Sequence, residues 1–233
     1  MQNVSALYTN ILAGDHWFET KVVIDNVGTF GESQLFSVST THQMFDTTPK
    51  VGMAVAGEID IKMIYPTVGI PTMACIRPYV RACNATQNSE WLPQGVFYVD
   101  TRERTKNDTG LSLITIHGFD AMLKAEQMFD GGTTITGDST DSSMVAFIAG
   151  KMGVTVDSRT YALMTAAYTI PLPTGYTYRE ILGYIASMYA GCFIMTEEGK
   201  LRLVAIYDIP PETNYLIDHA GNAITFGGDR ILV

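Results

Sequence analysis

Cysteine is scarce in this sequence, and its scarcity limits the kinds of site that the chain can build. Only three cysteines occur among 233 residues, Cys75, Cys83 and Cys192, and no two of them have the Cys-x-x-Cys spacing. A disulfide framework needs paired cysteines, and a zinc knuckle needs closely spaced ones. The sequence therefore predicts neither, and it favours a reducing compartment.

Charge is also low, and positive charge is the scarcer sign. Charged residues make up 17% of the chain, and 15 Lys and Arg against 24 Asp and Glu give a net charge of -9. Nucleic-acid binding needs clustered cations that neutralise phosphates, so the composition argues against it. The hydrophobic fraction of 46% supports a sizeable core and leaves apolar surface that we expect to meet other subunits.

Long hydrophobic runs are missing as well. A membrane-spanning helix needs roughly 20 predominantly apolar residues, and no segment approaches that length. The segment Met1–Ile11 has neither the basic start nor the apolar core of a signal peptide. We therefore expect no membrane span and assembly in the cytoplasm.

One polar cluster, Asp138–Ser143, has residue types that occur in enzymes. It contains serines that could act as nucleophiles and acids that could bind a hard cation. It has neither a Gly-x-Ser-x-Gly elbow nor the long alternating acid pattern of a calcium loop. We interpret it as a helix start, with Asp138, Ser139 or Asp141 as the capping residue.

The other residues of catalytic type are scattered. Glu58 and Asp60 share one face of a predicted strand, and Glu197 and Glu198 lie at a predicted hairpin turn, so we expect solvated or intersubunit carboxylates. Among the histidines, His117 is the one expected to have a fixed hydrogen-bond partner. Histidine occurs without paired spacing, at His16, His42, His117 and His219. The sequence predicts no catalytic residue, no cofactor and no metal.

The first half of the chain has the pattern of strands. Alternating residues and intervening Gly and Pro predict about seven short strands between residues 16 and 118, a spacing typical of a sandwich or barrel. A short helix capped by Asn3 or Ser5 precedes them. The predicted strands are Trp17–Ile24, Gln34–Thr40, Val51–Ala56, Glu58–Ile64, Met73–Cys83, Val96–Thr101 and Leu111–His117.

After Asp120 the pattern becomes helical. Good helix formers fill residues 121–127, and Thr177 with Glu180 has the form of a capping box before a further helix. The remaining predicted elements are a helix over Met144–Met152 ended by Gly153, a short strand Val154–Val156, a helix from Thr177 stopped at Gly191, and a hairpin of Cys192–Thr196 with Lys200–Ile206.

These elements predict an α+β multidomain chain, in which an antiparallel β-barrel-like or sandwich domain is followed by a small α/β domain. The predicted parts are a helical lead-in over residues 1–15, the β domain over 16–120, the α/β domain over 121–206, and a C-terminal strand segment over 207–233 that could start a second barrel.

Three segments in a fixed order carry a resemblance to a known family. They are the turn and strand Trp91–Asp100, the crossing from strand to helix His117–Leu123, and the unit from Arg179–Leu182 to Gly199–Leu203. In this order the chain resembles the tail-hub proteins (baseplate hub, tail-associated) of bacteriophages and prophages. The resemblance covers roughly residues 10–206 and rests on the order of the segments.

The resemblance implies a structural subunit of the virion tail, assembled in the bacterial host. It would form a ring, typically a homotrimer, that joins the tail tube to the tail tip. Its partners would be copies of itself, the tail tube, and distal tail and tip or spike proteins. Hubs of this family carry two related barrels per chain, whereas only one is visible here.

Two stretches are the candidate subunit contacts. One is the turn before a predicted strand, and the other is the polar connection Arg102–Gly110, which we expect at the tip of a hairpin. The candidate interface residues are Pro93, Gln94, Gly95, Arg102, Arg104 and Lys106. Two other functions stay open: a tail-associated peptidoglycan hydrolase using paired carboxylates, and a receptor- or glycan-binding β module using Trp17, Trp91 and exposed tyrosines.

Overall fold

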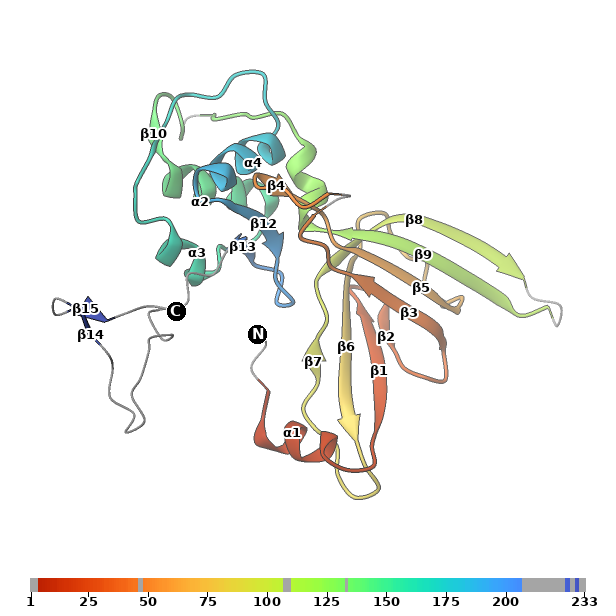
Figure 1. Cartoon of the computed structure of the whole chain (residues 1–233). Coiled ribbons are helices and arrows are strands. Elements are labelled where there is room, and N and C mark those ends of the chain that lie inside the picture. Colours follow the sequence, from red (N-terminus) through yellow and green to blue (C-terminus); the bar gives the residue numbers. More distant parts are fainter. Residues whose placement is uncertain are drawn as a thin grey trace.

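A computed structural model describes residues 4–45, 48–106, 110–132 and 134–206, with the backbone of residues 225–226 and 229–230. In these residues a large antiparallel sheet is followed by helices packed on a small three-stranded sheet. Figure 1 shows the large sheet fanning out from one side of the helical part. The predicted α+β class is confirmed.

The predicted lead-in helix is present as α1 (Ala6–Leu12), and Ser5 is its N-cap. The Ser5 hydroxyl accepts a hydrogen bond from the backbone N–H of Tyr8 at 3.1 Å. The backbone N–H and hydroxyl of Ser5 also donate to the Glu90 carboxylate at 2.7 and 2.6 Å. Glu90 therefore ties the start of α1 to the loop that precedes strand β7 (Leu92–Pro93).

The large sheet has eight strands in the order β2-β1-β6-β8-β9-β5-β3, with β7 paired to β6. All of its pairings are antiparallel. Its end strands β2 and β3 are not hydrogen-bonded to each other, so within the described residues the sheet is open and no barrel closes. The strands are β1 (Trp17–Ile24), β2 (Gly28–Phe30), β3 (Leu35–Thr41), β5 (Glu58–Ile64), β6 (Cys75–Cys83), β7 (Leu92–Pro93), β8 (Phe97–Lys106) and β9 (Ser112–Asp120).

Strand periodicity builds the core of this sheet. In β5 the side chains of Ile59, Ile61 and Met63 are buried and those of Glu58 and Asp60 are exposed, as the two-residue period predicts. Burying each such aliphatic side chain contributes about 1.5–3 kcal/mol. The cluster comprises Val22, Ile24, Phe30, Ile59, Ile61, Met63, Ile70, Ala74, Ile76, Phe97, Val99, Ile114 and Ile116.

The predicted polar connection Arg102–Gly110 is wrong in its first half. Strand β8 continues through Lys106, and Arg102 and Arg104 pair with Ile116 and Ile114 of β9. Beyond Val99 every residue of β8 is exposed, so charged side chains can remain in the strand without burial. Residues 107–109 lie outside the described residues.

The predicted strand Val51–Ala56 is wrong in length and in its sheet. Only Met53–Ala54 forms a strand, β4, and it pairs in parallel with β12 (Gly191–Met195) of the small sheet. Buried Ala54 joins the core of the second part. The chain thus leaves the large sheet after β3 and returns to it as β5 (Figure 1).

In the second part, the capping box and hairpin are confirmed. Thr177 and Glu180 satisfy each other's backbone at the start of α4, and β12 pairs with β13 around the turn at Gly199. The described elements are η1 (Ala121–Glu126), β10 (Ser139–Thr140), α2 (Asp141–Met152), α3 (Ser158–Leu163), β11 (Thr169–Ile170), α4 (Tyr178–Met188), β12 (Gly191–Met195) and β13 (Leu201–Ala205).

Several local predictions for this part are corrected. Residues 121–126 form a 3-10 helix, and the segment at Val156 makes a single bridge to Leu201 instead of a strand. Helix α4 ends at Met188, and Gly191 already belongs to β12. Helix α3 was not predicted, because its six residues are too short to show a helical period.

Two clusters of buried apolar side chains, one in each part, fit the idea of two domains. The boundaries at residues 15, 120 and 206 stay predictions. The predicted C-terminal strand segment over residues 207–233, which could start a second barrel, lies outside the described residues, apart from the short pairing of β14 (Thr225–Phe226) with β15 (Asp229–Arg230). Among the described residues, no helix is both long and apolar enough to cross a membrane.

Candidate functional site: the junction between the two parts

Asp120 holds the point where the large sheet passes into the helical part. It ends β9 and N-caps η1, and its side chain is buried. One carboxylate oxygen, Oδ2, accepts from the Gly57 N–H at 2.6 Å, and Oδ1 accepts from the Met122 N–H at 2.8 Å. Burial raises the pKa of Asp120 to about 6, although both hydrogen bonds oppose this shift.

His42 connects two loops beside this carboxylate. Its Nε2 lies 3.0 Å from the carbonyl oxygen of Gln94, and its ring centroid lies 5.7 Å from that of Phe97. A cavity of about 150 Å³ separates His42 and Asp120 from Met195 of the small sheet. The junction is therefore held by polar contacts around a small void.

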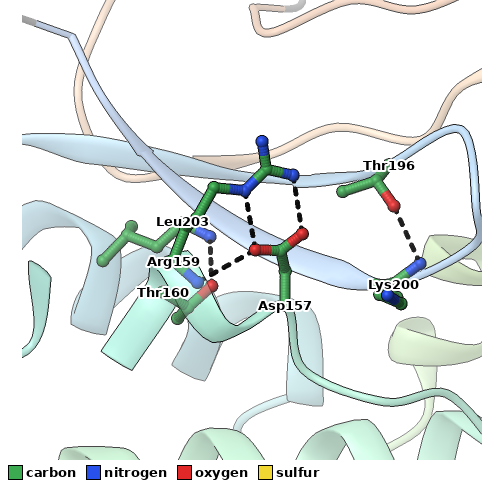
Figure 2. Close-up of polar contacts among 6 residues, drawn as sticks. All are labelled: Asp157, Arg159, Thr160, Thr196, Lys200 and Leu203. Carbon is green, nitrogen blue, oxygen red and sulfur yellow. Dashed lines mark hydrogen bonds and ion pairs between the residues drawn. The ribbon is translucent and has the colours of Figure 1, made fainter. Parts of the chain in front are cut away.

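A larger cleft of about 690 Å³ lies between β7 and the β12–β13 hairpin. Figure 2 shows its polar wall, in which Arg159 makes two hydrogen bonds to Asp157, at 2.8 Å from Nε and 2.7 Å from Nη2. The Arg159 guanidinium holds the pKa of Asp157 far below its ordinary value. Asp157 also caps α3, and Thr160 accepts from the Leu203 N–H at 3.0 Å. The Thr160 hydrogen bond therefore ties α3 to β13, and the Asp157–Arg159 pair orders the start of α3.

The opposite wall of this cleft carries Trp91, one of the predicted glycan contacts. The ammonium of Lys21 lies 4.3 Å from the Trp91 ring centroid, and the guanidinium carbon of Arg81 lies 4.5 Å from it. A sugar needs a free aromatic face for stacking, and cations of β1 and β6 already lie over this ring. The geometry does not favour the glycan-binding hypothesis at Trp91.

The candidate interface residues Pro93, Gln94 and Gly95 lie at the edge of the same cleft or beside it. Pro93 pairs with Tyr79 in the sheet, and the Gln94 N–H donates to the Pro78 carbonyl at 2.9 Å. Gly95 has φ +126°, and a Cβ there would collide with the Phe97 ring. Their role in subunit contact stays a prediction.

The candidates Arg102, Arg104 and Lys106 lie elsewhere, along the outer half of β8 (Figure 1). Arg102 donates to the Ile70 carbonyl, and the Arg104 guanidinium carbon lies 4.2 Å from the Tyr65 ring centroid. The structure therefore does not bring the two candidate stretches together.

Two further cations of the large sheet, Arg77 and Arg81, have partners within the chain. Arg77 forms an ion pair with Asp25, and Arg81 donates from Nε to the Glu19 carboxylate at 2.8 Å. These partners come from β1 and the turn after it. Sequence reasoning missed them because the register of β1 against β6 joins residues more than 50 positions apart.

The serine and aspartate cluster is a helix start, as predicted, but its N-cap is Thr140. Asp141, the first helical residue, is fully buried and accepts from the Tyr168 N–H at 3.2 Å and from the Tyr189 hydroxyl. The prediction for His117 is confirmed, since its Nδ1 lies 2.9 Å from Asp60 Oδ1. In the part of the chain that the structure describes, no group of three or more His, Cys, Asp or Glu could hold a metal.

A second large hollow, of about 670 Å³, runs beside β4. We name it the β4–α4 groove. One side is the β4 segment, another is α4, and the end of β9 with η1 completes it. The lining residues are Lys50, Gly52, Met53, Ala54, Val55, Ala56, Glu58, Phe119, Leu123, Glu126, Arg179, Glu180, Gly183, Tyr184 and Ser187.

Comparison with known proteins gives the fold a context. No protein-family model matches the chain. No curated protein sequence matches it either. Among solved structures, it is similar to the 43 kDa tail protein of prophage MuSo2 from Shewanella oneidensis, with a TM-score of 0.54 and 13% identity over 86% of this chain and 59% of that one.

A second similar structure is the tail protein from Neisseria meningitidis MC58. The TM-score is 0.52 and the identity 12%, over 88% of this chain and 58% of that one. The fold of this chain is similar to that of these two tail proteins. This chain spans somewhat less than three fifths of the length of both tail proteins.

Proposed function

We propose that this chain is a structural subunit of a phage or prophage tail hub or baseplate, in a ring that joins the tail tube to the tail tip. The observation that supports this most is the fold, which is shared over 86% and 88% of the chain with two tail proteins. The role would be geometric, and it requires no catalytic residue.

An open sheet edge supports assembly into a ring. Strand β3 borders the large sheet on one side, and its seven residues, Leu35–Thr41, carry no charge. Phe36 in this strand is 58% exposed. Monomeric proteins usually protect such an edge with charges, proline, bulges or a covering element, and of these β3 has one irregularity, between Leu35 and Ser37. Pairing with a strand of a neighbouring subunit would satisfy its free backbone groups.

The separation of the two candidate contact stretches also suits a ring. In a head-to-tail ring each subunit contacts its two neighbours through different patches. The turn Pro93–Gly95 and the outer half of β8, with Arg102, Arg104 and Lys106, would then face different neighbours. We propose a homotrimer, with the tail tube and the tip or spike proteins as further partners in the virion tail.

No specific observation favours the hydrolase. Glu58 and Asp60 lie on the exposed face of β5, and Asp60 is hydrogen-bonded to His117. Glu197 and Glu198 follow β12 in the hairpin turn. A glycosidase needs two carboxyl groups facing each other across a cleft at about 5–9 Å. The proposal is therefore for a structural protein.

The test measures the assembly state of the full chain by light scattering after size-exclusion chromatography, with negative-stain imaging. We expect a ring-shaped oligomer. Phe36→Lys should prevent its formation, because it places a charge on the β3 edge. The matched control is Val68→Lys, at a half-exposed loop position away from that edge. A chain that stays monomeric, also when mixed with tail tube protein, would contradict the proposal.

A further inference from the structure

The backbone edge of β4 forms one wall of the β4–α4 groove. Five consecutive residues, Gly52–Ala56, line it. Side chains in a strand alternate between two faces, so a groove on one face would be lined by every second residue. Lining by consecutive residues indicates that the groove lies along the edge of the strand. Within the described residues β4 is the end strand of the order β13-β12-β4. Half of its backbone donors and acceptors therefore point away from β12.

The opposite wall is helix α4, which holds this edge in place. A Cβ added to Gly52 would lie 3.0 Å from the carbonyl oxygen of Gly183, so strand and helix approach each other through their backbones. Ser187 also donates to the Gly183 carbonyl at 3.0 Å. The backbone contact between β4 and α4 therefore fixes the two walls of the groove relative to each other.

Apolar side chains cover much of the remaining lining. Val55 and Met53 come from the strand segment, Phe119 from β9 and Leu123 from η1. The side chain of Tyr184 in α4 is 56% exposed, so this large ring does not contribute to the core. Exposed tyrosine beside an apolar groove is typical of a protein-binding surface.

Two basic and three acidic residues line the groove, and among them Glu58 is the carboxylate that favours a cation beside it in the bound segment. Glu126 forms an ion pair with Arg179 at 2.8 Å, and Glu180 is used in the capping box. Glu58 is exposed, and neither it nor Lys50, the other basic residue of the lining, forms an ion pair with another described residue. A lysine or arginine placed next to Glu58 would complement this carboxylate.

We infer that the β4–α4 groove binds an extended segment of a partner protein, which adds as a strand to the free edge of β4. Backbone hydrogen bonds to β4 give affinity, and alternate apolar side chains pack against Tyr184 and Leu123. A basic residue of the segment contacts Glu58. This site is independent of ring formation, because it uses the small sheet and leaves the β3 edge free.

The test uses the full chain and a defined probe, the capped pentapeptide acetyl-Val-Lys-Val-Thr-Val-amide. Two variants of the probe are needed: one with glutamate in place of lysine, and one N-methylated at alternate residues. Binding is measured by chemical-shift changes in the protein amides. We expect saturable shifts at Ala54–Ala56, no binding of the N-methylated probe, and about tenfold weaker binding of the glutamate probe.

Variants of the protein then locate the site. Tyr184→Ala should weaken binding of the lysine probe, and Glu58→Lys should reverse the preference so that the glutamate probe binds better. Tyr161→Ala and Glu103→Lys, at exposed positions outside the groove, are matched controls that should bind as the unaltered chain does. Absence of binding, equal binding of the N-methylated probe, or an unchanged charge preference in Glu58→Lys would each overturn the inference.

Discussion

Gly52 and Gly183 pack backbone against backbone: a Cβ on residue 183 would lie 2.7 Å from the carbonyl oxygen of Gly52. Real Cβ atoms do not come this close to a backbone oxygen. Glycine inside a helix costs roughly 0.5–1 kcal/mol relative to alanine. In α4 that cost is offset by the approach of β4, which could not otherwise reach its place beside β12.

Gly183→Ala should therefore destabilise the chain, although alanine is the better helix former. We expect a loss of about 1–3 kcal/mol in the free energy of unfolding, because β4 must move away from α4. Gly150→Ala is the matched control, since Gly150 lies in α2 with no atom near a new Cβ. It should gain about 0.5–1 kcal/mol. Urea unfolding of both variants measures the two changes in the free energy of unfolding. If both variants were stabilised, or both destabilised, the result would contradict this prediction.

A second prediction concerns Gly199, at the turn of the β12–β13 hairpin. Its φ is +76°, and a Cβ there would lie 2.8 Å from Cγ2 of Val96. Gly199→Ala should lower stability by about 1–2 kcal/mol from the left-handed backbone alone, and by more from the collision. Adding Val96→Ala should relieve only part of the collision, because the Cβ of residue 96 would still lie 3.0 Å from the new Cβ. Gly137→Ala, with open space around it, should have little effect on the melting temperature.

The third prediction is a pH dependence that originates at Asp120. Its pKa in the folded chain is about 6, above the ordinary 3.8, so the folded state binds the proton more tightly than the unfolded state does. The stability from this group is full below about pH 4 and is lost as pH rises through about 6, a change of about 3 kcal/mol.

Asp120→Asn removes this titration. It also replaces two acceptor oxygens by one, so a backbone N–H of Gly57 or Met122 loses its acceptor. We expect the unaltered chain to exceed the variant in stability by more at pH 4 than at pH 7. Urea unfolding of both chains across this range measures the difference, and a constant difference would show that Asp120 does not titrate there.

The fourth prediction concerns Asp157, which caps α3 and binds Arg159. Asp157→Ala removes both functions and should cost about 1–3 kcal/mol. Because the pKa of Asp157 is lowered, its contribution is present above the ordinary carboxyl pKa and is lost as pH falls. The difference in unfolding free energy between the unaltered chain and Asp157→Ala should therefore become smaller as the pH is lowered.

Arg159→Ala is the control for the cap. The carboxylate of Asp157 would still accept from the backbone N–H of residue 159, which it does now at 2.9 Å. Since the Arg159 side chain is about half exposed, its removal should cost less than removal of Asp157. Thermal unfolding of the two variants ranks them, and the reverse order would show that the ion pair outweighs the cap.

Local patterns in the sequence predicted local structure well. The two-residue period gave the bounds Glu58–Ile64 of β5, and the Thr177 and Glu180 pair gave the start of α4. These succeed because side-chain alternation and capping depend only on neighbouring residues. The position of His117 at the end of a strand likewise predicts a fixed partner, which is Asp60.

Features that depend on distant packing were not predicted. Val51–Ala56 has strand propensity, but propensity does not say which sheet a strand joins. Met53–Ala54 joins the small sheet, and Gly52 directly before it can approach α4 because Gly183 leaves room. The charges of Arg102–Lys106 suggested a loop, whereas pairing with β9 overrides propensity where both faces are solvated. The role of Asp120 had one available signal, an aspartate directly before a run of helix formers.

The pairing of β4 with the small sheet affects how the chain responds to proteolysis and to the exchange of its parts. A protease cut just after Asp120 would break the covalent link from β9 to η1, yet β4 would still be paired with β12 across the cut. The two fragments would remain joined, as the halves of a complementing pair. For the same reason residues 121–206 cannot be exchanged alone between related chains. An exchange must also include β4, which lies in the loop before β5.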